Sequence, residues 1–208
     1  MTYRLILLLM SATVALNLSA CGSSPPSHYY RLTAASSTIG SQQQPEIGVG
    51  PVEIPQFLQR DAIVYSTGGN QLEIAGTELW AEPLADGAER VLGLNLASLL
   101  NTQNVTFFPW NIRNPPDIGI KVRILNLDAD PAAAVLSAEW LVYHPEDGAV
   151  IERQISTLTH SLSGSALSAS VLPEAYSALL FALAEKIADA ITQRPIETPT
   201  SEDAVPSA

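Results

Sequence analysis

A β-strand is expected over Ile118–Leu127, which reads IGIKVRILNL. Up to residue 124 the even positions are isoleucine or valine, while Lys121 and Arg123 fall on the opposite face, the pattern of a strand with one buried side. The phase then slips by one residue, because Leu125 and Leu127 are apolar and the even positions become polar. Such a slip is what a β-bulge produces, so we expect a bulged strand in a sheet with one covered face.

Strands are also expected on both sides of this stretch. Downstream, Val135–Tyr143 and Ala149–Leu162 flank a turn that contains proline, aspartate and glycine. Upstream, Ile47–Ile54 reads as a strand interrupted by Gly50 and Pro51. Because proline cannot donate to a strand ladder, this strand should lie near a sheet edge or carry a bulge.

Shorter segments complete the β-structure. Ala62–Ser66 and Gln71–Ala75 surround a glycine-rich turn and predict a hairpin. His28–Leu32 contains two tyrosines, which favour strands, and a further short strand is expected from Asn104 through Phe108. Pro55–Asp61 is expected to be a turn or a short helix.

Two segments change to helical spacing. Pro83–Leu100 and about Pro173–Thr192 each place apolar residues along one stripe, and each begins with proline, which suits the first helical turn. The order of strands, helix, strands and helix predicts an α+β (mixed α/β) domain. We expect a largely antiparallel or mixed β-sheet with the two amphipathic helices packed on one face.

The first 20 residues have the layout of a secretory signal peptide, with an apolar run of about 14 residues after a positively charged start. The run is too short to cross a bilayer core comfortably. It ends in Leu18-Ser19-Ala20-Cys21, which resembles a bacterial lipobox. The resemblance implies cleavage before Cys21 and acylation of that residue, the only cysteine in the chain. The alternative is an ordinary buried cysteine.

The residue after Cys21 and the composition of the rest of the chain predict the membrane location and the domain organisation. Gly22 stands where an aspartate would, in lipoproteins, favour retention in the inner membrane, so the outer membrane is expected, with the domain facing the periplasm. Residues 21–27 form a short tether rich in serine and proline, and residues 28–193 form one domain. The acidic, proline-rich tail, residues 194–208, cannot bury enough apolar surface to fold.

Charge excludes some partners. The chain has 10 basic and 21 acidic residues, a net charge of −11. Such a chain repels nucleic acid and anionic head groups, so any membrane attachment should come from the lipid on Cys21. With one cysteine, no internal disulfide can form, and the fold must be held by packing.

No motif points to catalysis, a metal or a cofactor. His28, His144 and His160 have no second ligand at metal-binding spacing. The serines around Ser163–Ser165 lack the glycines of a nucleophile elbow. We therefore expect a protein that is not an enzyme. An envelope hydrolase remains a much weaker reading, because catalytic groups converge in space and not in sequence.

The large aromatic residues are expected to pack in the core. They are Phe57, Trp80, Phe108, Trp110 and Trp140. If any of them were exposed, a partner-binding or lipid-binding surface would become the better interpretation.

The chain resembles the ABC-type transport auxiliary lipoprotein family, the PqiC-type lipoproteins, from Cys21 to about Gln193. The resemblance rests on the strand and turn in Val49–Val64, on Asn70–Leu72, and on Leu79–Leu84, which reads LWAEPL. Two departures are Leu79, where the family usually has a charged residue, and the acidic tail.

This resemblance implies a non-enzymatic outer-membrane lipoprotein of a Gram-negative bacterium, a subunit of a transporter that maintains envelope integrity. It would dock an MCE-domain protein anchored in the inner membrane and assist lipid transport between the membranes. A ring-like homo-oligomer is expected because MCE proteins form rings. A periplasmic carrier whose own groove binds a lipid is the alternative.

The functional site expected from the sequence is the lipidated Cys21. Pro55, Arg60, Trp80 and Glu82 of the family motifs are expected mainly to maintain the fold, with partner contact as the second possibility.

Overall fold

The computed structural model describes residues 3, 25–35, 45–163 and 167–193. Apart from residue 3, the predicted signal peptide lies outside the described residues, as do Cys21, the acidic tail and most of the polar loop between residues 34 and 45.

A five-stranded mixed sheet forms the centre of the domain, in the order β5-β2-β6-β7-β8. β2 pairs in parallel with both β5 and β6, whereas β6, β7 and β8 form an antiparallel meander. The strands are β2 (Ile47–Glu53), β5 (Val105–Phe107), β6 (Ile118–Ala129), β7 (Ala133–Tyr143) and β8 (Val150–Ser161).

Both interruptions predicted from the sequence are present. In β6 the register with β7 shifts between Ile124 and Asn126, where the alternation slips. In β2 the register with β6 shifts between Val49 and Val52, and Gly50 has a φ of +112°, a conformation that side chains other than glycine rarely adopt.

A second sheet, which the sequence analysis did not anticipate, has the order β1-β4-β3. Its strands are β1 (His28–Tyr30), β3 (Ala62–Gly68) and β4 (Gln71–Trp80). β3 and β4 form the expected hairpin, and β1 adds in parallel to the end of β4. The expected end of β4 at Ala75 was wrong, because the strand continues to Trp80, where β1 pairs with it on one side and Ala62 on the other.

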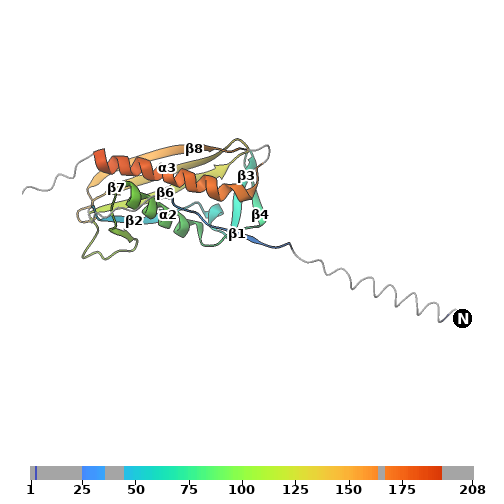
Figure 1. Ribbon diagram of the computed structural model, residues 1–208, viewed down its shortest axis with the longest axis horizontal. Helices are drawn as coiled ribbons and strands as arrows, with labels where there is room; N and C mark the ends of the chain where they lie inside the picture. The colour runs from blue at the N-terminus through green and yellow to red at the C-terminus, as the bar shows by residue number, and fades with distance from the viewer. Residues whose placement is uncertain (1–2, 4–24, 36–44, 164–166, 194–208) are drawn as a thin grey trace, which may run out of the picture.

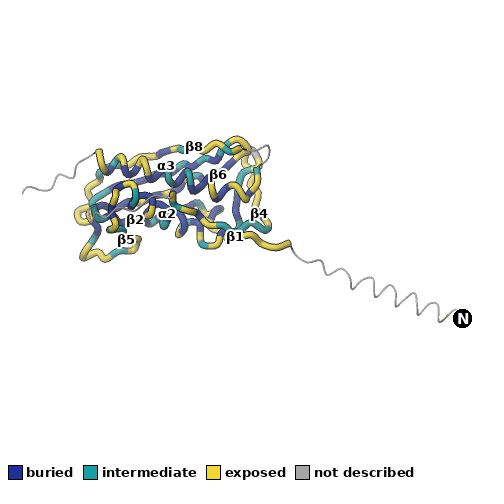
Figure 2. Tube along the Cα trace, in the orientation of Figure 1, coloured by how far each residue is buried: buried dark blue, intermediate teal, exposed yellow. Residues whose placement is uncertain are grey.

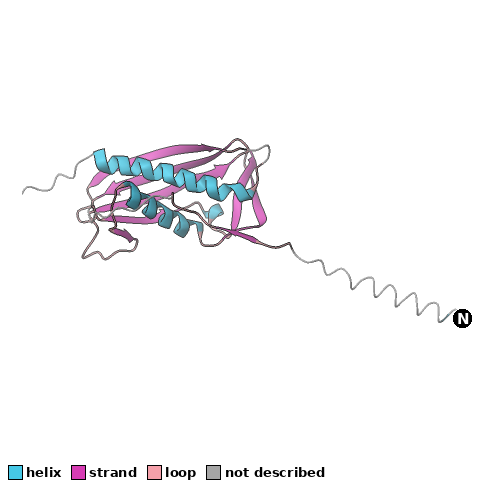
Figure 3. Ribbon diagram, in the orientation of Figure 1, coloured by secondary structure: helices cyan, strands magenta, loops and turns pink. Residues whose placement is uncertain are grey.

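Two helices cover one face of the five-stranded sheet, as expected (Figures 1 and 3). α2 (Leu84–Leu99) packs against β2, α3 (Leu172–Gln193) packs against β7 and β8, and the helices contact each other. Short 3₁₀ turns, η2 (Gln56–Leu58) and η3 (Ala169–Val171), precede β3 and α3. The buried residues lie between the helices and the sheet, while the other sheet face is more exposed (Figure 2).

The domain has two distinct ends. Figure 1 shows β1, the hairpin β3–β4 and the start of α3 at one end, which we call the β1 end. The C-terminal parts of α2 and α3 lie at the opposite end, close to β5, which we call the β5 end (Figures 1 and 2). The chain therefore enters the domain at one end, and the β5–β6 connection lies at the other.

Candidate functional site

The family motif around Trp80 forms the junction between β4 and α2. Trp80 is only 6% exposed, and its backbone N–H donates to the Asp61 carbonyl at 2.6 Å. Its ring stacks on Tyr176 of α3. Pro83 is the residue before α2, and Leu84 begins the helix with a buried side chain. The motif thus joins the small sheet to both helices.

Glu82 is held by an ion pair with Arg90 of α2. The same Arg90 Nη2 donates to the Leu32 carbonyl at 3.1 Å. Gly87 leaves room for the Glu82 carboxylate, because a Cβ at that position would lie 3.1 Å from Glu82 Oε1. Arg90 therefore connects the motif to the segment that follows β1.

That segment crosses both helices as a strap, residues Leu32–Ala35. Leu32 is buried, and the Thr33 N–H donates to Ser177 Oγ of α3 at 3.1 Å. The Ala35 N–H donates to Asn95 Oδ1 of α2 at 3.0 Å. Asn95 is itself buried, and its Nδ2 has no partner among the described residues. The strap therefore ties the segment that follows β1 to both helices.

A carboxylate completes the bulge in β2. Glu89 Oε2 of α2 accepts a hydrogen bond from the Val52 N–H at 3.2 Å, next to the register shift. A Cβ at Gly50 would collide with this carboxylate. Burial raises the pKa of Glu89, the hydrogen bond from Val52 lowers it in part, and the negative charge of Asp86 raises it further.

Pro55 and Arg60 lie on either side of η2, in the turn that leads into β3. Pro55 is the residue before η2, and its carbonyl accepts the Leu58 N–H at 3.0 Å. Arg60 is exposed, and its Nε donates to the Phe57 carbonyl at 3.0 Å. The structure thus places Trp80 and Glu82 at the junction between β4 and α2, and Pro55 and Arg60 on the turn before β3, which meets the junction through the hydrogen bond from the Trp80 N–H to the Asp61 carbonyl. Their partner contact stays a prediction.

An exposed apolar loop lies at the β5 end, between β5 and β6. Phe108 is about half exposed, and Ile112 is 91% exposed. The loop is anchored, because the Trp110 ring contacts Phe108 edge to face at 5.4 Å between centroids, and the Phe108 N–H donates to the Val49 carbonyl at 2.9 Å. Expecting Phe108 to pack in the core was wrong. The sequence feature that could have indicated an exposed loop is the presence of Phe108, Trp110 and Ile112 in a proline-rich segment, which cannot form a regular buried element.

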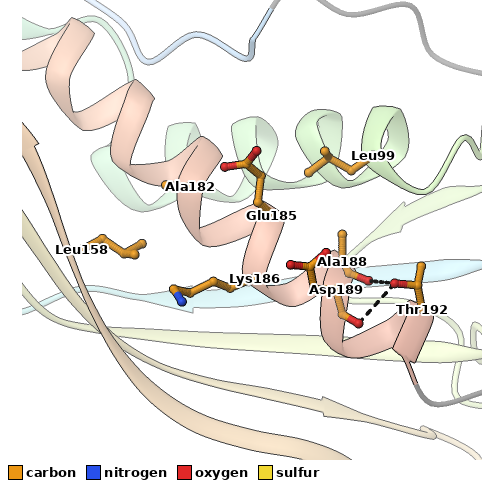
Figure 4. Close-up of a pocket in the computed structure, with 8 residues that line it drawn as sticks. All are labelled: Leu99, Leu158, Ala182, Glu185, Lys186, Ala188, Asp189 and Thr192. Atoms are coloured by element: carbon orange, nitrogen blue, oxygen red, sulfur yellow. Dashed lines mark hydrogen bonds between the residues drawn. The ribbon is translucent and has the colours of Figure 1, made fainter.

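Three surface grooves on the described part of the chain have the volume to be compared with a lipid site. The one with the largest volume of the three, about 510 Å³, runs over the C-terminal half of α3 (Figure 4). Its lining includes Glu185, Lys186 and Asp189, and it is open to solvent. The others have volumes of about 300 Å³ and 100 Å³ and are also open. A lipid chain prefers an enclosed apolar lining, which these grooves do not provide.

Within residues 25–35, 45–163 and 167–193, no helix has the length and apolar character needed to cross a membrane. In the same part of the chain, no three histidine, cysteine or acidic residues are grouped as metal ligands. His144 lies at the end of β7, where its Nδ1 is 3.0 Å from the Asp117 carbonyl oxygen.

Comparison with curated proteins finds intermembrane transport lipoproteins. The chain is 29% identical over 143 residues to "Intermembrane transport lipoprotein PqiC" of Escherichia coli K12, covering 67% of this chain and 74% of that protein. The protein of the same name from Shigella flexneri matches to the same extent.

Solved structures share the fold. A crystal structure of a Xanthomonas campestris protein superposes with a TM-score of 0.63 at 14% identity, covering 78% of this chain and 93% of that chain. A second crystal structure, of an uncharacterized protein, gives a TM-score of 0.54 at 21% identity over 78% of this chain and 99% of that one. At these identities the likeness concerns the fold alone.

The family model described as "ABC-type transport auxiliary lipoprotein component" matches residues 30–188. The match begins in β1 and ends within α3, so it includes both sheets and both helices. The family is defined by a role in transport and is not a class of enzymes. The chain belongs to the ABC-type transport auxiliary lipoprotein family.

Proposed function

We propose that this chain is an outer-membrane lipoprotein that docks an MCE-domain protein in an intermembrane lipid transport system. Cys21, acylated after removal of residues 1–20, would anchor it in the leaflet that faces the periplasm. Family membership and the likeness to an intermembrane transport lipoprotein support the transport role. The lipobox-like sequence before Cys21 supports the anchor.

The observation that carries the docking role is the polarity of the domain. The chain enters at the β1 end (Figure 1), whereas the loop between β5 and β6, with exposed Phe108 and Ile112, follows β5 at the β5 end. Ile112 is 91% exposed, so its side chain contributes little apolar burial to the stability of the fold. Burial of this side chain against a partner protein would be favourable. If the β1 end is held at the outer membrane, this loop would face the periplasm, where the MCE-domain protein would contact it.

The lipid-carrier alternative receives less support. The grooves on the described residues are open and partly charged, and the space between helices and sheet is filled by buried side chains. A ring-like homo-oligomer remains part of the proposal. Its test is the mass of the unlipidated domain in solution by light scattering, where a monomer would count against the ring.

The docking role is tested by chemical crosslinking in cells followed by purification of the chain. We expect the MCE-domain protein of the same transport system to co-purify with the wild type. Recovery should fall with Phe108→Ser and Ile112→Ser and should persist with Ile155→Ser, a change at an exposed isoleucine of β8. Equal recovery from all variants would reject the loop as the docking surface.

The anchor is tested separately. Cys21→Ser should move the chain from the membrane fraction to the soluble periplasmic fraction and remove incorporation of labelled palmitate. If membrane association and envelope integrity were unchanged in this variant, the proposed function would be wrong.

A further inference from the structure

The second sheet has one face turned away from the helices. Trp80 faces the core, where it stacks on Tyr176, so the adjacent residue Leu79 projects to the opposite, outer face. Residues directly opposite each other in a ladder project to the same face. Ala62, Val64 and Ser66 alternate along β3 and lie opposite the outward positions of β4, with a register shift between Ala62 and Val64, and Val64 itself is buried. The pairs are Tyr29–Leu79, Ala62–Leu79, Val64–Ile74 and Ser66–Leu72.

This outer face exposes apolar side chains and carries no charge at the paired positions. Tyr29 is 67% exposed, Ile74 52% and Leu72 44%. None of the residues in these pairs is acidic or basic, although the chain has 21 acidic residues. Single exposed apolar residues are common, but three on one uncharged face of a small sheet are typical of a contact surface.

The tether determines what lies near this face. Seven residue steps separate Cys21 from His28, the first residue of β1. A fully extended chain spans at most about 3.5 Å per residue, so β1 cannot be more than about 25 Å from the acylated residue. Tyr29, the second residue of β1, is therefore held close to the bilayer that carries the anchor.

We propose that the outer face of the β1-β4-β3 sheet, Tyr29, Leu72 and Ile74, rests on the phospholipid surface in which the chain is anchored. This inference rests on the lipidation of Cys21 in the proposed function. Tyrosine favours the membrane–water interface, and leucine and isoleucine bury apolar surface among the acyl chains.

Contact of this kind would give the domain a fixed orientation. A lipid anchor on a flexible tether restricts distance but not rotation, whereas a second, weaker membrane contact restricts both. The β5 end, with Phe108 and Ile112, would then be presented away from the membrane.

The test uses the mature chain, residues 21–208, coupled through its only thiol to a maleimide phospholipid in vesicles of phosphatidylethanolamine and phosphatidylglycerol. A photoreactive benzophenone amino acid replaces Leu72 in one variant and Ile155 on β8 in the control. Both positions are exposed, and thermal melting checks that both variants fold. We expect about tenfold more lipid adduct, measured by mass spectrometry, from position 72 than from position 155.

Three results would overturn the proposal: equal lipid adducts at the two positions, adducts between two copies of the chain at position 72, or no loss of lipid adduct at 72 when Tyr29→Ser and Ile74→Ser are added. Because the vesicle coupling is chemical, none of these results depends on acylation in the cell. Failure of the anchor itself would instead appear in the Cys21→Ser fractionation.

Discussion

The ring of Trp80 stacks on the ring of Tyr176, with centroids 6.4 Å apart and planes inclined by 27°. Trp80 ends β4 and Tyr176 lies in the first turns of α3, so this contact joins the small sheet to the helical layer. Tyr176 is buried, and its hydroxyl has no partner among the described residues. Burial, and secondarily the negative charge of Asp128, raises the pKa of Tyr176 well above its ordinary value.

Tyr176→Phe should therefore stabilise the protein. The substitution keeps the stacked ring and removes a buried polar group whose unsatisfied state costs about 1 kcal/mol or more. We expect a gain of about 1 kcal/mol in the free energy of unfolding, measured with urea at neutral pH.

The advantage of Tyr176→Phe should widen above about pH 10, where unfolded tyrosine ionises. A raised pKa in the folded state means that ionisation favours the unfolded chain as pH rises, and phenylalanine lacks this loss. A lower stability of the variant at neutral pH would mean that the hydroxyl has a partner that the described residues do not include.

Arg90→Met should loosen the strap. It removes the ion pair with Glu82 and the hydrogen bond to the Leu32 carbonyl, but keeps an apolar stem of similar length. Because the pair is partly exposed, we expect a loss of about 1 kcal/mol. Hydrogen exchange should also become faster in residues 32–35.

Arg153→Met is the matched control for this change. Arg153 pairs with Glu139 at 3.0 Å on the exposed face of the five-stranded sheet. Its removal should change stability by less than about 0.5 kcal/mol and leave exchange in the strap unchanged. Equal effects of the two substitutions would argue against a special role of Arg90.

Much of the fold could be predicted from the sequence, because its local patterns are unusually clear. The alternation in Ile118–Leu127 located a strand and the bulge within it. The two helical stripes became the two helices on one sheet face, since each strip of apolar residues can be buried only against another element.

The second sheet could not be predicted. β1 pairs with β4 across a separation of 50 residues. The alternation of side chains within His28–Tyr30 does not indicate which strand it pairs with. β4 also shifts register with β3 between Val64 and Ala62, so the residues from Gly76 to Leu79 do not alternate as a regular strand does. The strap could not be predicted either, because its hydrogen bonds to the helices are made by the backbone groups of Leu32, Thr33 and Ala35, and these groups are the same in every sequence.

Gly48→Ala should destabilise the β5 end. A Cβ at Gly48 would lie 2.5 Å from Pro116 Cγ and 2.9 Å from Trp110 Cζ3, and these rigid rings cannot move aside easily. Overpacking of this kind costs about 1–3 kcal/mol. We expect a lower melting temperature, a change in tryptophan emission and weaker docking.

Gly76→Ala supplies the control, because a Cβ there has no atom within 4 Å. This substitution should leave stability unchanged or improve it slightly. If Gly48→Ala were equally harmless, the loop would not be held against β2 as described.

Glu89→Gln should be tolerated, and it should reduce the dependence of stability on pH. The glutamine Oε1 can accept the same hydrogen bond from the Val52 N–H that the carboxylate accepts at 3.2 Å. The pKa of Glu89 is raised, chiefly by burial, so its proton is bound more tightly in the folded chain than in the unfolded chain. This contribution to stability is present below the ordinary glutamate pKa and is lost as pH rises through the higher, folded-state value.

The measurement is the melting temperature of wild type and variant between about pH 4 and pH 8, across the ordinary glutamate pKa. At neutral pH, Glu89→Gln should melt at the same temperature as the wild type or higher, since it no longer buries a charge. On acidification the wild type should gain relative to the variant. The opposite trend would mean that the ionised carboxylate is favoured at the bulge, with the hydrogen bond from Val52 outweighing the cost of burial.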